Sequence, residues 1–284
     1  YPGFVLSSLG IAGFVTGSTS LGLNLMPLPY VLATLLGGGG LLVAYVIYSR
    51  RLANPILDLS LFAIPSFRAS VIGGLLFRIG IGAMPFLLPL MLQLGYGLTP
   101  FQSGSVTFVS AIGAIAMKFV APPLLRRFGF RSVLIANSFI AAIFIGMPAA
   151  FDIGTPLHLI TGLLFIGGFF RSLQFTSANA LSYADVPQAR MSRATSLTSV
   201  FQQLAMSIGV SVGAIALELS LAGTDGTIEV ATFHPAFIAI GLISMSSAIF
   251  FMRMPRNAGE EMSGRKLKPK PLAPDPVTAM RERA

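Results

Sequence analysis

Residues 69–92 read ASVIGGLLFRIGIGAMPFLLPLML, an apolar run interrupted by one charged side chain, Arg78. A helix needs about 20 such residues to cross a hydrocarbon core about 30 Å thick. Gly80, Gly82 and Pro85 are tolerated inside a membrane helix, because neighbouring helices satisfy the backbone groups that these residues free. The run therefore predicts a transmembrane α-helix rather than the buried helix of a soluble domain.

The composition of the whole chain agrees with this helix. Of 284 residues, 54% are hydrophobic and only 10% are charged, whereas a soluble domain carries about 25% charged residues. Disordered chains are poor in large apolar residues, so disorder is excluded too, and the apolar segments are too long and uniform for barrel strands. We predict an all-α polytopic membrane protein with eight transmembrane helices. Their approximate ranges are 2–22, 27–49, 69–92, 103–124, 131–151, 157–182, 194–219 and 233–252.

The basic residues predict the orientation in the membrane. All but three of the 19 Lys and Arg residues fall in the loops 50–68, 125–131 and 183–193 or in the tail 253–284. These segments lie on one side if the eight helices alternate in direction, and the opposite loops contain no Lys or Arg. Because basic residues are retained in the cytoplasm, we expect both ends of the chain to be cytoplasmic. The net charge of +9 then reflects membrane topology, and we expect no nucleic-acid partner.

The two ends of the chain differ from the helices. Residues 253–284 are rich in Pro, Lys and Arg and lack apolar periodicity, which predicts a disordered basic tail. A contact of residues 266–270 with anionic membrane lipid is an alternative, but a solvated tail is the simpler interpretation. The chain starts with Tyr1 rather than Met and carries no secretory signal. We therefore expect a fragment or a processed chain whose upstream part is missing.

Three basic residues, Arg78, Lys118 and Arg171, fall inside predicted helices. A charge at the bilayer centre costs about 2.5–3.5 kcal/mol, so such residues usually face the bundle interior or a wet cavity. Arg78 lies ~15 Å beyond Arg68 along its helix and Arg171 is central in its own, whereas Lys118 can snorkel to the interface. Each arginine either pairs within the bundle and stabilises it or forms a wall of a substrate cavity. Gln174 follows Arg171 by three residues and is expected on the same helix face. Gln174 and Lys118 therefore join the two arginines as candidate substrate-binding or cavity residues.

Other kinds of site are not indicated. No Asp or Glu is central in a predicted helix, so a buried carboxylate that couples transport to protons is expected in the missing part. The two histidines, His158 and His234, stand apart, whereas a metal site needs several clustered ligands. We predict no metal, no cofactor and no catalytic cluster, and therefore no enzyme.

Several stretches from residue 54 onward carry a family resemblance. They are NPILDLSLF at 54–62, LPLMLQ at 88–93 and LTPFQSG at 98–104. These stretches resemble the fourteen-helix drug:proton antiporter branch of the major facilitator superfamily, and 77–93 together with the Lys118 region is most similar to its multidrug-resistance protein D type. The resemblance covers nearly the whole chain and is more specific for superfamily and branch than for substrate.

The resemblance implies a division of the chain. Residues 1–50 would be a central two-helix pair, 51–68 a cytoplasmic connecting loop, and 69–252 the C-terminal six-helix transporter bundle, with the tail after it. The N-terminal six-helix bundle would be missing. The first and fourth helices of each bundle, equivalent halves of an inverted repeat, wall the cavity in this superfamily. These are the helices of Arg78 and Arg171, which favours a cavity role for both.

The loop 125–131 resembles the family's cytoplasmic gating motif and places Arg127, Gly129 and Arg131 in it. The motif normally has an acidic residue where Arg126 stands. The carboxylate that would clamp a neighbouring helix terminus is therefore absent from this loop.

These observations lead to a functional hypothesis. The chain is expected to be the C-terminal part of a secondary active transporter in the inner membrane of a bacterium, working by alternating access. The resemblance implies proton-coupled efflux of a drug or metabolite, and the buried cations favour an anionic small-molecule substrate. The expected partners are thus a small molecule, protons, membrane lipid and the missing N-terminal bundle. A non-transporting membrane receptor or assembly subunit is the alternative.

Overall fold

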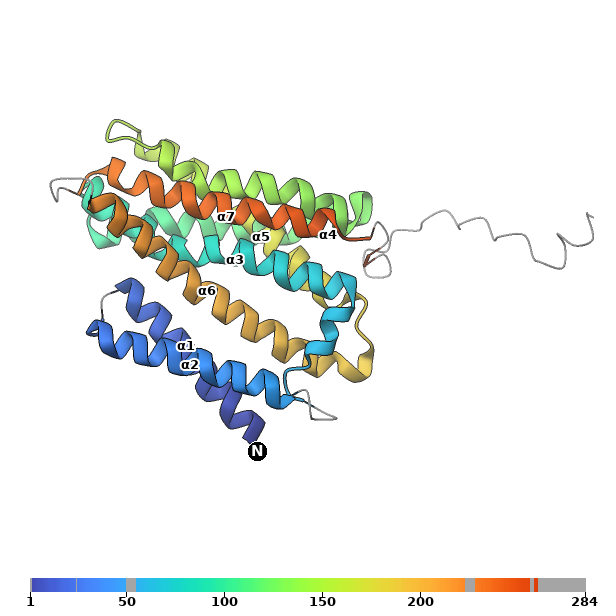
Figure 1. Ribbon diagram of the computed structural model, residues 1–284. Helices are drawn as coiled ribbons and strands as arrows, with labels where there is room; N and C mark the ends of the chain where they lie inside the picture. Colours follow the sequence, from blue (N-terminus) through green and yellow to red (C-terminus); the bar gives the residue numbers. More distant parts are fainter. Residues whose placement is uncertain (1, 24, 50–54, 223–227, 256–257, 260–284) are drawn as a thin grey trace, which may run out of the picture.

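The computed structural model describes residues 2–23, 25–49, 55–222, 228–255 and 258–259, and within these ranges the protein is all-α without strands. Seven helices within the described residues are long and apolar enough to cross a membrane, so the chain is a multi-pass membrane protein (Figure 1). The helices are α1 (Pro2–Leu23), α2 (Leu28–Ser49), α3 (Pro65–Leu90), α4 (Pro100–Gly146), α5 (Leu157–Ala184), α6 (Met191–Leu221) and α7 (His234–Met252).

α4 is longer than one crossing requires, and it reverses direction near its middle. Its 47 residues include Gly129 with φ 77° and ψ 160°, a conformation that essentially only glycine adopts. Both halves bond to the same part of α5: Ser172 Oγ donates to Ala114 O at 2.8 Å, and Asn137 Nδ2 donates to Phe170 O at 2.9 Å. Ala114 and Asn137 would be ~35 Å apart along a straight helix. The halves therefore form a hairpin with Gly129 at its tip.

Local sequence explains how α3 ends and α4 begins. Pro89 lies in the last turn of α3, and the chain continues through a π-helical turn, Met91–Gly95, to Gly97 with φ 69°. Thr99 then caps α4 in a capping box with Gln102, each side chain bonding the other's backbone N–H. Helix ends inside a membrane protein need such partners because their terminal N–H groups have none within the helix.

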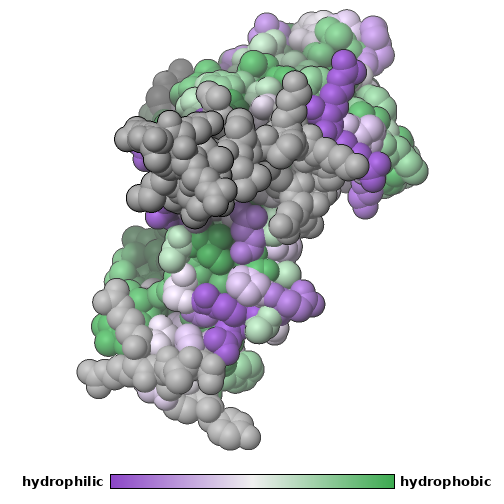
Figure 2. Space-filling view, turned by 90° about the vertical axis from the view of Figure 1, so that its right-hand side faces the viewer, coloured by the Kyte–Doolittle hydropathy of each residue, from purple (hydrophilic) through white to green (hydrophobic). Residues whose placement is uncertain are grey.

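The basic loops gather at one end of the bundle. A buried cluster there contains Ala69 at the start of α3, Leu125 and Phe130 beside the α4 tip, Leu181 near the end of α5 and Phe251 near the end of α7. Figure 2 looks onto this end and shows hydrophilic residues in patches beside hydrophobic surface. The arginines of this end that the structure describes are Arg68, Arg126, Arg127, Arg131, Arg190, Arg193 and Arg253.

The grouping of basic loops that we predicted from the sequence is therefore present in the fold, while the side of the membrane on which they lie stays a prediction. Arg50, Arg51 and the tail residues 256–257 and 260–284 lie outside the described residues. The expected disorder of the tail and its alternative lipid contact are therefore not tested.

α1 and α2 form a separate hairpin, and α1 packs against α6 of the remaining helices (Figure 1). The two helices approach closely because Gly38 faces α1: a Cβ at Gly38 would collide with the backbone of Gly13 and Phe14. Ser211 Oγ of α6 donates a hydrogen bond to the carbonyl oxygen of Ser18 on α1. The pair expected at residues 1–50 is thus a distinct hairpin, and the division of the chain into transporter domains stays a prediction.

Candidate functional site

Arg78 lies inside the bundle on α3, and only 2% of its surface is exposed. Its Nη2 donates to Asn179 Oδ1 on α5 at 2.6 Å, and its Cζ lies 5.1 Å from the centre of the Phe175 ring. Gly74 makes room for it, because a Cβ there would collide with Arg78 Nη1. The guanidinium is therefore held by an amide, an aromatic face and a glycine recess, and its buried Nε lacks a hydrogen-bond partner among the described residues.

A second amide extends this contact to α6. Gln202 Nε2 donates to the same Asn179 Oδ1 at 2.9 Å, so one carbonyl oxygen accepts hydrogen bonds from α3 and α6. A carbonyl oxygen has two lone pairs, so both bonds can exist together. Arg78 thus fixes three helices relative to one another without a carboxylate.

Arg171 occupies a different environment. It is partly buried on α5 and lines a cavity of about 330 Å³ between α3, α4 and α5. Pro85 and Met84 form the α3 wall of this cavity, Ala114 belongs to the α4 wall, and Phe175 separates the cavity from Arg78. Among the described residues, none bonds or pairs with the Arg171 guanidinium. A volume of this size falls within the range of small-molecule sites.

Lys118 extends the same wall of α4 toward the basic end. It lies one turn beyond Ala114, which lines the cavity, and its side chain is exposed. The sequence prediction that it can snorkel fits this exposure, but no contact joins Lys118 to Arg171.

Gln174 faces the second half of α4 instead of the cavity. It is fully buried, its Oε1 accepts from Asn137 Nδ2 at 2.9 Å, and its Nε2 donates to Ser138 Oγ at 2.7 Å. Ser138 is in turn bonded by Ser247 of α7 at 3.3 Å. The structure therefore places Gln174 in the packing of α4, α5 and α7, away from Arg171.

The residues of the expected gating loop surround the tip of the α4 hairpin. Arg127 is exposed, with its Cζ 5.4 Å from the centre of the Phe128 ring. Arg131 Nη2 donates to the carbonyl oxygen of Met252, the last residue of α7, at 2.8 Å. A cation is favourable there because carbonyl groups at a helix C-terminus carry partial negative charge. Gly129 is the tip itself, and a gating role for the three residues stays a prediction.

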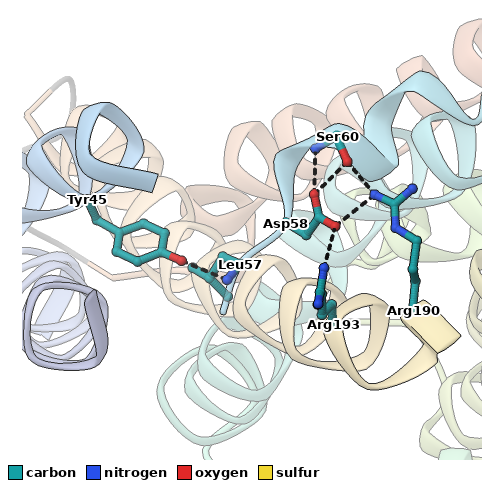
Figure 3. A network of polar contacts seen from close by, with 6 residues as sticks. All are labelled: Tyr45, Leu57, Asp58, Ser60, Arg190 and Arg193. Atoms are coloured by element: carbon teal, nitrogen blue, oxygen red, sulfur yellow. Dashed lines mark hydrogen bonds and ion pairs between the residues drawn. The ribbon is translucent and has the colours of Figure 1, made fainter. Parts of the chain in front are cut away.

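An acidic residue at the same end joins the loop before α3 to the start of α6 (Figure 3). The Asp58 carboxylate precedes α3 and pairs with Arg190 Nη2 at 2.7 Å and Arg193 Nη1 at 3.6 Å, both at the start of α6. It also accepts hydrogen bonds from Ser60 N at 3.1 Å and Ser60 Oγ at 2.6 Å. Burial raises the pKa of this carboxyl, but the bonds from Ser60 and Arg190 outweigh burial, so its pKa lies below the ordinary 3.8.

The loop that carries Asp58 is also tied to the α1–α2 hairpin. Tyr45 OH of α2 accepts a hydrogen bond from Leu57 N at 2.7 Å, and both residues are buried (Figure 3). The α1–α2 hairpin, the loop before α3 and the start of α6 are therefore one connected polar network.

Sequence reasoning missed Phe175, Asn179 and Gln202 as site residues. Arg171, Phe175 and Asn179 are spaced by four residues, so they follow one face of α5, whereas Gln174 lies on the neighbouring face. This spacing was a signal that could have grouped the first three. Within the described ranges, no group of three or more His, Asp or Glu side chains could hold a metal ion.

The residues described so far define a polytopic membrane protein with a basic internal site. The profile of the Major Facilitator Superfamily matches residues 70–284, and the chain belongs to this superfamily of transporters, which are not enzymes. Proteins named "Putative multidrug resistance protein MdtD" from Salmonella paratyphi B, Salmonella heidelberg and Salmonella typhi are each 30% identical over 268 residues. The match covers 92% of this chain and 56% of each relative, so the chain spans about half the length of these curated relatives.

The comparisons confirm the family resemblance, and the structure confirms an all-α membrane fold in the residues that it describes. The prediction that the chain is no enzyme agrees with its membership of a transporter superfamily. The comparisons favour the transporter over the receptor or assembly subunit, which remained open from the sequence. The substrate, the coupling ion and the orientation in the membrane are proposed in the next subsection.

Proposed function

We propose that this chain is the C-terminal part of a secondary active transporter that exports a small anionic molecule in exchange for protons. The observation that carries the proposal is Arg171, a cation in a 330 Å³ cavity with no partner among the described residues. An unpaired charge at membrane depth is costly, and a bound anion would offset that cost. Low local dielectric strengthens the attraction.

The two arginines take different roles in this proposal. Arg78 already has Asn179, Phe175 and the space left by Gly74, so it positions α3, α5 and α6 relative to one another beside the cavity. Arg171 has an open guanidinium, so it contacts the substrate. Lys118 raises the positive potential along the route to the cavity from the basic end.

The rest of the transporter must come from outside this chain. The relatives are named as multidrug resistance proteins and are about twice as long, which supports an N-terminal bundle that forms the opposite wall. The described helices hold no central carboxylate, so that bundle would also supply the proton-carrying group. Transport would proceed by rocking of the two bundles about the midplane site, with residues 125–131 in the cytoplasmic gate.

We further propose eight membrane crossings with both ends of the chain in the cytoplasm of a bacterium. A 47-residue helix measures ~70 Å, more than twice a hydrocarbon core, which supports two crossings for α4. The grouping of the basic loops supports a cytoplasmic position for its tip at Gly129. Residues 1–50 would then be the central pair, 51–68 the connecting loop and 69–252 the C-terminal bundle.

The test is transport by the full-length protein in proteoliposomes with an imposed proton gradient. An aromatic carboxylic acid and a cationic dye of similar size are offered separately to the wild type and to Arg171→Gln. We expect faster transport of the acid by the wild type and a loss of that preference in Arg171→Gln. A preference for the cationic dye that Arg171→Gln leaves unchanged would refute the proposed substrate class.

A further inference from the structure

A second cavity lies on the α4 hairpin, outside the site of Arg171. Its volume is about 300 Å³, and it is lined by both halves of α4 and by α5. Leu124 and Phe128 form the side before the hairpin tip, and Ser132, Ala136 and Ile140 form the side after it. We call this cavity the α4 groove.

The α4 groove opens to the outside of the bundle. Phe128 is 47% exposed and Ile140 is 37% exposed, and Ser132 and Ala136 are also exposed. Ile140 is 11 residues from Gly129, so the groove runs ~16 Å from the hairpin tip along the helices. Because α4 crosses the membrane, this apolar surface faces acyl chains.

Two cations without an acidic partner lie within three residues of the hairpin tip, toward which the α4 groove runs. Arg126 and Arg127 are exposed, and neither pairs with an Asp or Glu among the described residues. Arg127 lies over the ring of Phe128, which lines the groove. Arg131 differs from them because it is bound to the end of α7. An apolar groove that ends near two exposed cations is chemically complementary to an amphiphile with an acidic headgroup.

We propose that the α4 groove binds one anionic phospholipid, with an acyl chain between the halves of α4 and the phosphate near the hairpin tip, where Arg127 adjoins the groove and Arg126 adds positive charge. Each basic residue near a membrane surface strengthens the attraction of anionic lipid about fivefold. The apolar groove holds the chain, and the two arginines select the charge of the headgroup. The bound lipid would stabilise the hairpin tip of α4. Arg131 at this tip is already hydrogen-bonded to the end of α7.

The test is native mass spectrometry of the purified full-length protein titrated with phosphatidylglycerol or phosphatidylcholine of equal chain length. We expect the wild type to retain phosphatidylglycerol preferentially. The double variant Arg126→Gln/Arg127→Gln should lose that preference by about 25-fold, which is fivefold for each charge. Arg68→Gln is the matched control, because Arg68 is an exposed arginine at the same end that does not adjoin the groove; it should leave the preference unchanged.

A second variant tests the apolar part of the site. Ala136→Phe fills the α4 groove from an exposed position, so it should reduce retention of both lipids, whereas Ile143→Phe, on the same helix outside the groove, should not. The proposal is overturned if the double arginine variant keeps the full preference, or if Ala136→Phe and Ile143→Phe behave alike. It is also overturned if free glycerol phosphate competes as well as the lipid, or if the full-length protein binds no lipid because another segment covers the groove.

Discussion

Gly82 of α3 packs directly against the backbone of Met206 on α6, one helical turn beyond Arg78. A Cβ at position 82 would lie 2.5 Å from Met206 O and 2.8 Å from Met206 Cα. Carbon atoms do not approach backbone atoms closer than about 3.0 Å, so Gly82→Ala must push α3 and α6 apart by about 0.5 Å. Overpacking of this kind costs about 1–3 kcal/mol. The higher helix propensity of alanine offsets up to about 1 kcal/mol of this loss of stability.

Two other glycines provide graded controls for Gly82→Ala. A Cβ at Gly213, also between α3 and α6, would meet only side-chain atoms at tight but tolerable distances, Ala83 Cβ at 3.1 Å and Leu87 Cδ1 at 3.2 Å, and the Leu87 side chain can shift. A Cβ at Gly104 would meet nothing within 4 Å. We therefore expect the order of stability to be Gly104→Ala above Gly213→Ala, with Gly82→Ala lowest.

The measurement is thermal unfolding of the purified full-length protein, followed by the helical circular dichroism signal. At about 2–4 °C per kcal/mol, Gly82→Ala should melt roughly 2–12 °C below Gly104→Ala. Its transport rate should fall as well, because the displaced helix carries Arg78. Equal melting temperatures for Gly82→Ala and Gly104→Ala would refute the close packing of α3 on α6.

Two further substitutions separate structural from functional polar residues. Asp58→Asn removes a carboxylate that is 7% exposed from an arginine that is 32% exposed, so it should cost about 1–2 kcal/mol, between surface and buried ion pairs. Because the folded pKa of Asp58 is lowered, its contribution to stability is present above the unfolded pKa of about 3.9 and is lost as pH falls through the folded value. Urea unfolding should therefore show a larger difference between wild type and Asp58→Asn at pH 7 than at pH 3. Gln174→Leu should cost about 1–2 kcal/mol by removing its interhelical hydrogen bonds while leaving the KM for transport unchanged, and a large rise in KM would place Gln174 in the cavity after all.

The helices were predictable because crossing a bilayer imposes a length and a composition on each of them. The ranges 27–49, 157–182 and 233–252 agree with α2, α5 and α7 to within a few residues. The range 103–124 and most of 131–151 fall in one helix, α4, since the chain reverses at the single glycine Gly129 and the residues on either side of it are helical. Eight crossings therefore stay a proposal, while seven long apolar helices are present in the described residues.

The sequence predicted only which residues of the site are energetically costly to place inside the membrane, and not how they are arranged. A charge inside an apolar run is visible in sequence, which is why Arg78 and Arg171 were found. Their partners depend on how α3, α5 and α6 pack, and Asn179 is 101 residues from Arg78 in the chain. The local three-residue spacing favoured Gln174 as the neighbour of Arg171, but the four-residue spacing to Phe175 follows the cavity face.

The same limit applies to the polar network at the basic end. The positive-inside pattern placed Arg190 and the loop of Asp58 on one side of the membrane, which the fold brings together. It gave no reason to pair them, because the carboxylate and the arginine are separated by 132 residues. The charge pattern therefore predicts which loops share an end, and tertiary packing decides which side chains meet.

The central claim is that the Arg171 guanidinium binds a negatively charged substrate. The most direct measurement is the initial rate of export of an aromatic carboxylate, relative to its uncharged amide, for wild type, Arg171→Lys and Arg171→Gln in proteoliposomes. We expect the wild type to prefer the carboxylate, Arg171→Lys to keep part of the preference, and Arg171→Gln to abolish it. An unchanged preference in Arg171→Gln, with protein that folds and inserts normally, would show that the Arg171 guanidinium does not bind the substrate charge.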